Sequence, residues 1–359
     1  MNEICGALFK WYDTHKRDLP WRSTRIPYYI WISEVILQQT RVAQGYDYFV
    51  RFIKRFPTVE DLAIASEDEV MRIWQGLGYY SRARNLHAAA KQIVGMGAFP
   101  DRYDSIRQLK GVGDYTAAAI ASFAFDEPKA AVDGNVCRVW SRLFAIDEPI
   151  DTTRGKQAIT EIAQALLPEE HAAKYNQAVM EFGALQCTPQ SPKCDECPLA
   201  HKCVALATGR VGELPMKSHK TKVEPRYFSY LYIHDGESLL LHKRSANDIW
   251  LNLYELPLIE TSAPVDPDEM LNTSDFKAWH TILSEVVYKG TTGTIKHVLS
   301  HRVLHTVFYE LEVGGSLPCL EGFVVVPFSE LEYYALPRLI EKYLEEKIGD
   351  DKVDVKKNI

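Results

Sequence analysis

Four cysteines in the middle of the chain have the spacing of a metal-binding loop. Cys187, Cys194, Cys197 and Cys203 are separated by six, two and five residues. Two thiolates two residues apart can bind one metal centre from a tight turn, and two more complete a set of four ligands. The spacing alone leaves a structural zinc ion and an iron–sulfur cluster as alternatives. With seven cysteines in total, an odd number, a metal site in a reducing compartment is favoured over a set of disulfides.

Two acidic residues stand where an ordinary surface carboxylate is not expected. Glu34 lies in YYIWISEVILQQT, where helical spacing surrounds it with apolar side chains. Burial there raises a carboxyl pKa, so the group can hold a proton near neutral pH and give it to a leaving group. The alternative is a structural glutamate paired with an arginine. Asp133, in AAVDGNVCRV, either caps the following helix or, ionised, stabilises positive charge on a sugar.

A turn containing two glycines precedes a helix of small residues in LKGVGDYTAAAI. Gly111 and Gly113 allow a tight turn that exposes backbone N–H groups, and the start of the next helix adds its positive dipole end. With Val112 between them, they form a candidate helix–hairpin–helix site for a DNA phosphate. A plain helix end and turn is the alternative. A phosphate held in this way positions DNA without reading its sequence.

The elements that must position these residues fall into two parts. Through residues 1–207, apolar residues recur at three- and four-residue spacing between short glycine and proline breaks, which predicts an all-α domain. Residues 208–226 are polar and basic and are interpreted as a linker. Residues 227–347 predict a smaller α+β domain, and residues 348–359 a charged, frayed tail.

The second domain shows its own pattern of strands and helices. A hairpin is predicted around Asp235–Gly236, and two further strands meet near Ser300–His301. One helix each is expected over residues 276–288 and 336–347.

Composition and charge restrict the class of protein. No apolar run reaches the ~18 residues of a membrane span and the N-terminus lacks a signal pattern, so we expect a cytoplasmic protein, nucleoid-associated if bacterial, with no membrane partner. The net charge is −7. Residues 1–220 carry 27 basic and 26 acidic residues, whereas residues 221–359 carry 14 and 22. The first part is therefore free to present a basic face to DNA.

Taken in order, these motifs resemble the endonuclease III superfamily of DNA glycosylases. The cysteine spacing, LKGVGDYTAAAI and VDGNVCRV carry this resemblance. LPWR (19–22), SEVILQQT (33–40) and GLGYYSRARNLH (76–87) are similar, more specifically, to the MutY-type adenine DNA glycosylases. The match covers nearly all of residues 7–207 and extends more weakly beyond. It implies an all-α helix–hairpin–helix glycosylase domain with one [4Fe-4S] cluster on the cysteine loop, residues 187–203.

The resemblance also implies a reaction and a partner. The protein would act as a monomer on double-stranded DNA with adenine opposite 8-oxoguanine or guanine, extrude the adenine and hydrolyse its N-glycosidic bond in base-excision repair. Glu34 would protonate the base at N7, Asp133 would stabilise the cationic sugar, and Asn135 would assist beside it. Further implied residues are Arg17, Leu19, Trp21, Arg22 and Gln177 in the adenine pocket, and Gln39 and Tyr79 as wedges in the base stack.

Tyr115 distinguishes two branches of this superfamily. Bifunctional enzymes of the endonuclease III type resemble this hairpin but have a lysine there, which forms a Schiff base. A tyrosine has no amine, and Lys110 does not match the position. We therefore expect a monofunctional enzyme in which water completes the hydrolysis and Tyr115 helps to order the site.

In this family the C-terminal domain resembles MutT, the Nudix hydrolase, and recognises the strand with 8-oxoguanine. LLLHKRSANDIWLNLYELPL is similar to part of that fold, but the carboxylate cluster of a Nudix metal box is absent from residues 257–285. Metal-dependent pyrophosphate hydrolysis is therefore not expected. HVLSH is similar to the FSH reading loop of the family, with Leu299 in place of phenylalanine, and implies that Ser300 and His301 contact the oxidised guanine.

Three rival functions remain to be weighed. A bifunctional pyrimidine-lesion glycosylase/lyase is disfavoured by Tyr115 and by the extra domain. A DNA-binding module without activity would need neither Glu34 nor Asp133. An active Nudix hydrolase is disfavoured by the missing metal box.

Overall fold

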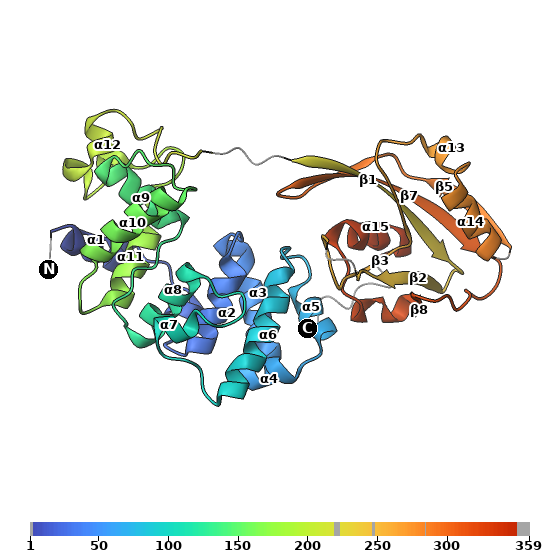
Figure 1. Ribbon diagram of the computed structural model, residues 1–359, viewed down its shortest axis with the longest axis horizontal. Helices are drawn as coiled ribbons and strands as arrows, with labels where there is room; N and C mark the ends of the chain where they lie inside the picture. The colour runs from blue at the N-terminus through green and yellow to red at the C-terminus, as the bar shows by residue number, and fades with distance from the viewer. Residues whose placement is uncertain (1–2, 219–222, 246–247, 284, 350–359) are drawn as a thin grey trace. The chain divides into compact units, whose positions relative to one another are not determined.

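The computed structural model of the protein describes residues 3–218, 223–245, 248–283 and 285–349. Residues 219–222 of the predicted linker and 350–359 of the predicted tail lie outside these ranges. The chain divides into two compact units (Figure 1), one of residues 1–64 and 85–220 and the other of residues 65–84 and 221–359. In the part of the chain that is described, no helix is long and apolar enough to cross a membrane.

The first unit is built from helices, which confirms the predicted all-α class. Its elements are α1 (Glu3–His15), η1 (Pro20–Arg22), α2 (Pro27–Leu37), α3 (Val42–Arg55), α4 (Val59–Ile64), most of α6 (Ser81–Met96), α7 (Tyr103–Ile106), α8 (Asp114–Phe125), α9 (Gly134–Phe144), α10 (Thr153–Leu166), α11 (Ala172–Leu185), η2 (Cys194–Glu196), η3 (Ala200–Lys202) and α12 (Val204–Ala207).

Helix α8 is the centre of this unit. Every residue from Thr116 to Ala124 is buried, and α8 packs against α2, α7 and α11. Its small side chains allow neighbouring helices to approach closely, so residues from four helices can meet at one site. Helix α2 starts with Pro27 at its first turn, a position where the missing N–H costs nothing, and is buried from Ile30 to Ile36. The apolar surroundings predicted for this helix are therefore present on all its sides.

The second unit is a mixed sheet with helices. Its strands are β1 (Glu224–His234), β2 (Ser238–Lys243), β3 (Tyr254–Glu255), β4 (Leu258–Thr261), β5 (Val286–Thr291), β6 (Ile295–Val298), β7 (Arg302–Val313) and β8 (Phe323–Pro327). Its helices are α5 (Glu67–Trp74), α13 (Pro267–Met270), α14 (Ser274–Ile282), η4 (Phe328–Tyr333) and α15 (Arg338–Ile348). The strand order is β3-β2-β1-β7-β5, with β4 on β1, β6 on β7 and β8 on β2.

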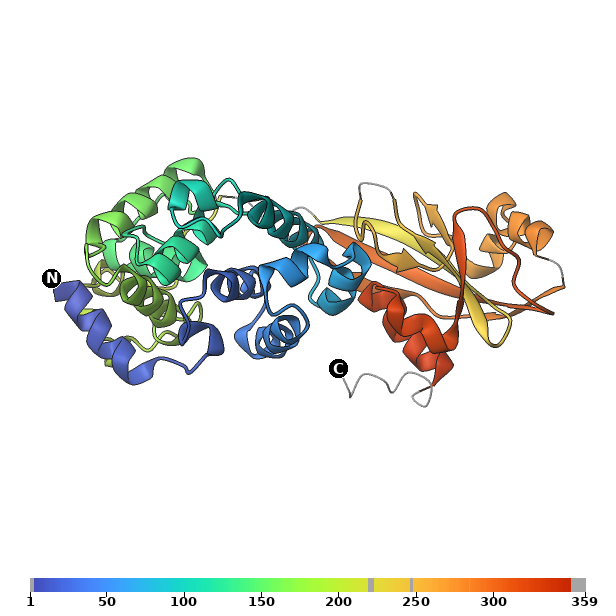
Figure 2. The same cartoon turned by 90° about the horizontal axis from the view of Figure 1, so that it is seen from below.

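Two apolar cores lie on the two faces of this sheet. The long strands β1 and β7 run parallel, with Tyr230 opposite Phe308. Helix α15 contributes to the core that contains both of these rings, whereas α13 and α14 contribute to the other core (Figure 2). Alternate residues of one strand point to opposite faces, which is how the same strands supply both cores.

Both predicted hairpins are present, at the β1–β2 and β6–β7 connections. The helix predicted over residues 276–288 is wrong in its second half, because α14 ends at Ile282 and β5 begins at Val286. Glu285 between them has a left-handed φ of 53°, and the Val-Val-Tyr sequence that follows favours a strand. Strand β1 begins at Glu224, so the last residues of the predicted linker belong to the sheet.

The segment 65–84, which the sequence placed in the helical domain, groups with the second unit. Arg84 Nη1 donates to the carbonyl oxygen of Leu251 at 2.8 Å, and Gln75 Oε1 accepts from the backbone N–H of Leu336 at 3.3 Å. These contacts join residues far apart in the sequence, which explains why periodicity along the chain did not reveal them.

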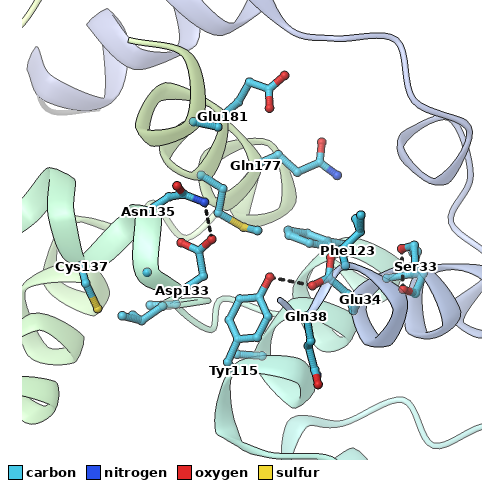
Figure 3. A pocket seen from close by; sticks show the side chains of 18 of the residues that line it. Ser33, Glu34, Gln38, Tyr115, Phe123, Asp133, Asn135, Cys137, Gln177 and Glu181 are labelled. Atoms are coloured by element: carbon cyan, nitrogen blue, oxygen red, sulfur yellow. Dashed lines mark hydrogen bonds between the residues drawn. The ribbon is translucent and has the colours of Figure 1, made fainter. Parts of the chain in front are cut away.

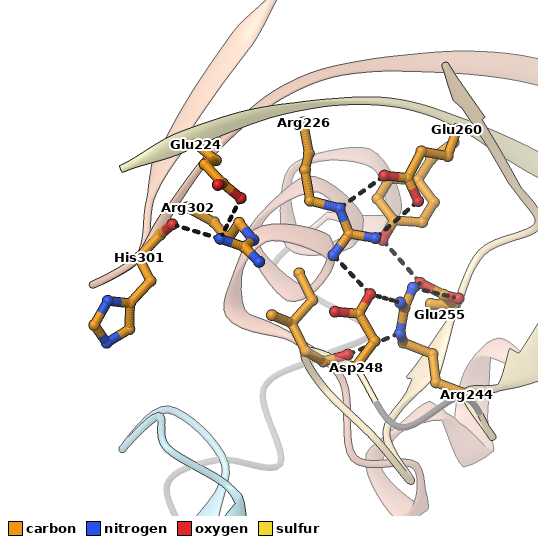
Figure 4. Close-up of polar contacts among 10 residues, drawn as sticks. Glu224, Arg226, Arg244, Asp248, Glu255, Glu260, His301 and Arg302 are labelled. Atoms are coloured by element: carbon orange, nitrogen blue, oxygen red, sulfur yellow. Dashed lines mark hydrogen bonds and ion pairs between the residues drawn. The ribbon is translucent and has the colours of Figure 1, made fainter. Parts of the chain in front are cut away.

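A chain of ion pairs joins the strands of the second unit to the loop after β2 (Figure 4). Arg226 pairs with Glu260 at 2.7 Å and with Asp248 at 2.6 Å. Arg244 Nη2 lies 3.1 Å from the same Asp248 carboxylate, and its Nη1 lies 2.7 Å from Glu255. Arg244 and Glu255 are buried, so each charge depends on its partner, and loss of either would leave an unpaired charge in the core.

Candidate active site

A cavity of about 1440 Å³ in the first unit gathers most of the residues that the sequence singled out (Figure 3). Its lining includes Arg17, Leu19, Trp21, Arg22, Glu34, Gln39, Tyr115, Asp133, Asn135 and Gln177. Pockets for small ligands usually measure about 300–1,000 Å³. This cavity has room for more than one planar base, which suits a group that enters while still attached to a larger molecule.

Glu34 meets the conditions for a proton donor. It is only 7% exposed, and its Oε2 accepts a hydrogen bond from the Tyr115 hydroxyl at 2.6 Å. Burial, with a further contribution from Asp133, raises the pKa of Glu34 to about 7, against the opposing effect of the Tyr115 hydrogen bond. Among the described residues Glu34 forms no ion pair. The structure therefore does not support the alternative, a structural glutamate paired with an arginine.

Asp133 is placed both to cap helix α9 and to present its carboxylate to the cavity. Its Oδ1 accepts the backbone N–H of Val136 at 2.7 Å, so it caps α9. Its Oδ2 accepts a hydrogen bond from Asn135 Nδ2 at 2.7 Å, and both residues line the cavity. Burial raises the pKa of Asp133, and the two hydrogen bonds oppose this rise because they favour the ionised form. Helix capping therefore holds the carboxylate in place beside the cavity.

Tyr115 connects α8 to Glu34. It lies in the first turn of α8, and burial raises its pKa well above the ordinary value. The hydroxyl therefore stays protonated and can donate to Glu34 at any pH near neutrality. A second contact between the same two elements joins Gln38 Nε2 to Thr116 Oγ1 at 3.1 Å. The end of α2 and the start of α8 are thus fixed relative to each other.

Glu181 is the main cavity residue that the sequence analysis missed. Its oxygens accept hydrogen bonds from Arg17 Nε at 2.8 Å and from Arg22 Nη1 at 2.8 Å and Nη2 at 2.6 Å. Although burial acts to raise it, the pKa of Glu181 is lowered to about 2 by hydrogen bonds from Arg22 and Arg17. Glu181 follows Gln177 by four residues on α11, within the apolar sequence AVMEFGAL. Like Glu34, Glu181 is an acidic residue among apolar neighbours on a helix, and this pattern could have indicated it.

Trp21 is both a core residue and a wall of the cavity. It is 7% exposed, its ring packs edge-to-face on Phe49 with centroids 5.1 Å apart, and it lines the cavity. The edge-to-face contact fixes the orientation of the indole, so that it presents a rigid apolar surface to a ligand.

The two residues predicted as wedges have an unusual backbone. Gln39, at the cavity, has a φ of 59°, and Tyr79, in the second unit, has a φ of 47°. A left-handed backbone is uncommon for residues other than glycine and marks positions held by their surroundings. The Tyr79 side chain is 47% exposed, so it is not an ordinary core residue.

The residues predicted to contact the oxidised guanine lie at the β6–β7 tip of the second unit and are not among the residues that line the cavity. The Ser300 hydroxyl forms a short hydrogen bond with the Tyr79 hydroxyl, so these two predicted DNA contacts lie side by side. Ser300 and His301 are exposed, whereas Leu299 packs against the core of this unit. Leu299 therefore helps to anchor the tip to the core.

The predicted phosphate site lies at the turn between α7 and α8 and does not line the cavity. Gly111 has a φ of 74°, and a Cβ there would come 2.5 Å from the Cβ of Asn85, so only glycine fits. Val112 is buried and anchors the turn, while Gly111 and Gly113 are exposed. The first N–H groups of α8 follow directly, which is the arrangement that suits an anion.

The donor set of the cysteine loop fits an iron–sulfur group. All four cysteines are half-buried free thiols, and Arg142 Nη1 donates to Cys187 Sγ at 3.4 Å. Burial, with a smaller contribution from the three neighbouring thiols, raises the pKa of Cys197 to about 11. The four sulfurs thus lie close enough to affect one another's charge, and a positive metal centre is what allows all of them to ionise.

Arg138 joins this loop to the cavity. Its Nη2 donates to Asn135 Oδ1 at 2.8 Å and its Nε to the carbonyl oxygen of Cys187 at 2.8 Å. Asn135 in turn donates to Asp133. A change in the position of Cys187 would therefore reach the Asp133 carboxylate through two side chains.

The raised pKa of Glu34 predicts a pH-dependent gain in stability for the Glu34→Gln variant. As the pH rises from 4.5 to about 7, folded protein keeps a proton that the unfolded chain releases, so the wild type loses stability. Its pKa of about 7, against 4.5, corresponds to about 3 kcal/mol. Thermal unfolding should therefore show Glu34→Gln more stable than the wild type at pH 8, with a smaller difference at pH 5.

Glu181→Gln provides a control in which the expected change in stability has the opposite sign. Because the pKa of Glu181 is lowered, its ion pairs stabilise the fold throughout this pH range, and the variant should be less stable at both values. A Glu34→Gln variant that is less stable than the wild type at pH 8 would show that Glu34 is not buried as a costly charge.

Three family comparisons cover most of the chain. Residues 32–169 match the HhH-GPD superfamily of base excision DNA repair proteins, residues 187–203 the iron–sulfur binding domain of endonuclease III, and residues 229–346 a NUDIX domain. The second match supports an iron–sulfur centre, rather than zinc, at the four cysteines.

Individual relatives agree with this assignment. The chain is 44% identical over 222 residues to the adenine DNA glycosylase of Rattus norvegicus, covering 58% of this chain and 43% of that protein, so it spans less than half the length of that relative. It is 32% identical over 304 residues to the adenine DNA glycosylase of Buchnera aphidicola subsp. Baizongia pistaciae, covering 83% of each. The structure of a thermostable thymine-DNA glycosylase matches with a TM-score of 0.53 and 29% identity, covering 57% of this chain and 95% of that one. Cavity, cysteine loop and domain order together place the chain in the family of MutY-type adenine DNA glycosylases.

Proposed function

We propose that the protein is a monofunctional DNA glycosylase that removes adenine paired with 8-oxoguanine, or with guanine, from duplex DNA. The observation that carries this proposal is the position of the Glu34 carboxyl, which lines the same cavity as Asp133. The pKa of Glu34 is about 7. Cleavage of a glycosidic bond requires one carboxyl that holds a proton and a second carboxylate that can stabilise positive charge.

Glu34 acts as the general acid. With a pKa of about 7, it is protonated in roughly half of the molecules at pH 7 and can protonate N7 of an extruded adenine. Protonation turns the base into a better leaving group, a contribution of roughly 10²–10⁴ in rate. The Tyr115 hydroxyl, 2.6 Å from Glu34 Oε2, holds the carboxyl in one orientation and leaves its other oxygen for the base.

Asp133 stabilises the positive charge that develops on the sugar as the bond breaks. Asn135 holds its Oδ2, so the carboxylate is already oriented when the charge appears and need not reorganise. Tyr115 has no amine to form an imine with C1′. Water therefore completes the hydrolysis and the DNA strand remains unbroken.

The remaining residues hold the DNA and the base. Trp21 and Leu19 supply apolar walls for the adenine, and Arg17, Arg22 and Gln177 supply polar groups. The proposed contacts outside the pocket are Gln39 and Tyr79 as wedges in the base stack, Gly111, Val112 and Gly113 at a phosphate, and Ser300 and His301 at the oxidised guanine. Extrusion of a base requires such wedges, because the gap in the stack must be filled.

The iron–sulfur group is proposed to be a single [4Fe-4S] cluster bound by Cys187, Cys194, Cys197 and Cys203. The match of residues 187–203 to the iron–sulfur binding domain of endonuclease III supports this proposal, as does a set of four thiolates, the usual ligands of such a cluster. The cluster would supply a rigid cross-link for a loop with little core of its own.

A strand-specific cleavage assay tests the proposed activity. A duplex with adenine opposite 8-oxoguanine, labelled on the adenine strand, should break only after hot alkali, because base removal leaves an alkali-sensitive site. Glu34→Gln should lower the rate by roughly 10²–10⁴-fold and keep duplex affinity, while Glu60→Gln, at an exposed glutamate, should leave both unchanged.

Breakage without alkali, or attack only on a duplex with oxidised thymine, would identify a glycosylase/lyase instead. Binding without excision would identify a DNA-binding module.

The pH dependence of the single-turnover rate follows from Glu34. Only the protonated form donates, so the rate should fall about tenfold per pH unit above the pKa of about 7. If bound DNA buries Glu34 further, its pKa rises and the fall in rate begins at a higher pH. A rate that stays constant from pH 6 to 9, at saturating enzyme, would contradict the role of Glu34 as acid.

The cluster is tested by composition. Purified protein should be brown and contain about four iron and four acid-labile sulfide per chain, and Cys197→Ser should lose both. Cys319→Ser is the matched control, because Cys319 is an exposed cysteine outside the loop. Stoichiometric zinc with no labile sulfide would contradict the proposal.

A further inference from the structure

Tyr12 reaches from the N-terminal helix to the cavity wall. Its hydroxyl donates a hydrogen bond to Gln177 Oε1 at 2.7 Å, across 165 residues of sequence. Tyr12 is 4% exposed, and α1, which carries it, packs against α11, which carries Gln177. Tyr12 does not line the cavity itself, whereas Gln177 does.

The surroundings of Tyr12 fix the direction of this hydrogen bond. Burial raises the pKa of Tyr12, with Arg22 opposing and Glu181 adding to the rise, so the hydroxyl keeps its proton. The positive charge of Arg22 attracts the lone pairs of the phenol oxygen and repels its proton. The protonated hydroxyl is the donor, and Gln177 Oε1 accepts the hydrogen bond at 2.7 Å.

Occupation of Oε1 determines what Gln177 presents to a ligand. An amide has one acceptor oxygen and one NH₂ donor group on opposite sides. With the oxygen held by Tyr12, the nitrogen remains, and no hydrogen-bond partner of Gln177 Nε2 is found among the residues described. The neighbouring oxygens of Glu181 are already occupied by Arg17 and Arg22. This wall of the cavity is thus left with a donor and no free carboxylate.

We propose that Tyr12 is a positioning residue that fixes Gln177 as a hydrogen-bond donor to a ring nitrogen of the extruded purine. The inference rests on the proposed adenine excision and adds a residue to it. Without the Tyr12 hydroxyl, the Gln177 amide is free to turn by 180° and to place its carbonyl oxygen against the lone pair of the base. A buried donor in a fixed orientation discriminates far more strongly than one that can rotate.

A double-mutant cycle tests this coupling through single-turnover excision at saturating enzyme. Tyr12→Phe removes only the hydroxyl and should lower the rate roughly five- to twentyfold, the effect of one oriented hydrogen bond. Gln177→Leu should lower it at least as much. Tyr12→Phe in the Gln177→Leu background should cause no further loss, because Tyr12 acts only through Gln177. The affinity for a duplex with an abasic site, which has no base to orient, should be unchanged in all three variants.

Tyr28→Phe is the matched control. Tyr28 is 5% exposed, its hydroxyl donates to the carbonyl oxygen of Phe56 at 2.8 Å, and it does not line the cavity. This variant should lose about as much thermal stability as Tyr12→Phe but excise adenine at the wild-type rate. The comparison separates loss of a buried hydrogen bond from loss of orientation in the pocket.

The outcomes distinguish this inference from the proposed function. Wild-type excision together with an unchanged rate in Tyr12→Phe would overturn the inference alone. So would rate losses that add in the double variant, or a loss in Tyr28→Phe equal to that in Tyr12→Phe. A wild-type protein that does not excise adenine would overturn both. Equal losses in Gln177→Leu and in the double variant, with a normal Tyr28→Phe, would support the inference.

Discussion

A carboxyl group enclosed by apolar side chains is the constraint on which the cavity depends. Burial of Glu34 on α2 raises its pKa to about 7, which costs the folded protein about 3 kcal/mol when the group is ionised. This cost is not offset by an ion pair, because the side chain that α8 brings to the Glu34 carboxyl is the neutral hydroxyl of Tyr115 and not a basic group. An arginine there would stabilise the fold and hold Glu34 ionised, with no proton to give.

The two buried glutamates of the cavity show how partners decide protonation. Glu34 and Glu181 are both less than a tenth exposed. Glu181 receives hydrogen bonds from Arg17 and Arg22, which lower its pKa to about 2, whereas Glu34 receives one from a neutral phenol. The result is one acid and one fixed anion on the walls of the same cavity. The anion orients two arginines, and the amide nitrogen of the neighbouring Gln177, whose oxygen is held by Tyr12, remains as a donor on this wall.

The features predictable from sequence are those in which local pattern alone carries the information. The spacing of the four cysteines and the apolar helix around Glu34 are of this kind, and the all-α class follows from periodicity. Contacts between distant segments are not local, so the pairing of Tyr12 with Gln177 and the grouping of residues 65–84 with the second unit could not be predicted. Glu181 could have been found by the reasoning used for Glu34. The strand at Val286 was missed because a left-handed Glu285 interrupts a pattern that otherwise continues as helix.

The protonation state of Glu34 can be measured directly. In protein labelled with ¹³C at the glutamate carboxyl carbons, an NMR titration should show one resonance with a midpoint near the pKa of about 7, and this resonance should be absent from the Glu34→Gln variant. Such a result would establish that the cavity holds a proton at neutral pH, as general-acid cleavage requires. If every glutamate carboxyl titrates below pH 5, Glu34 is ionised at neutral pH and the account of the site is contradicted.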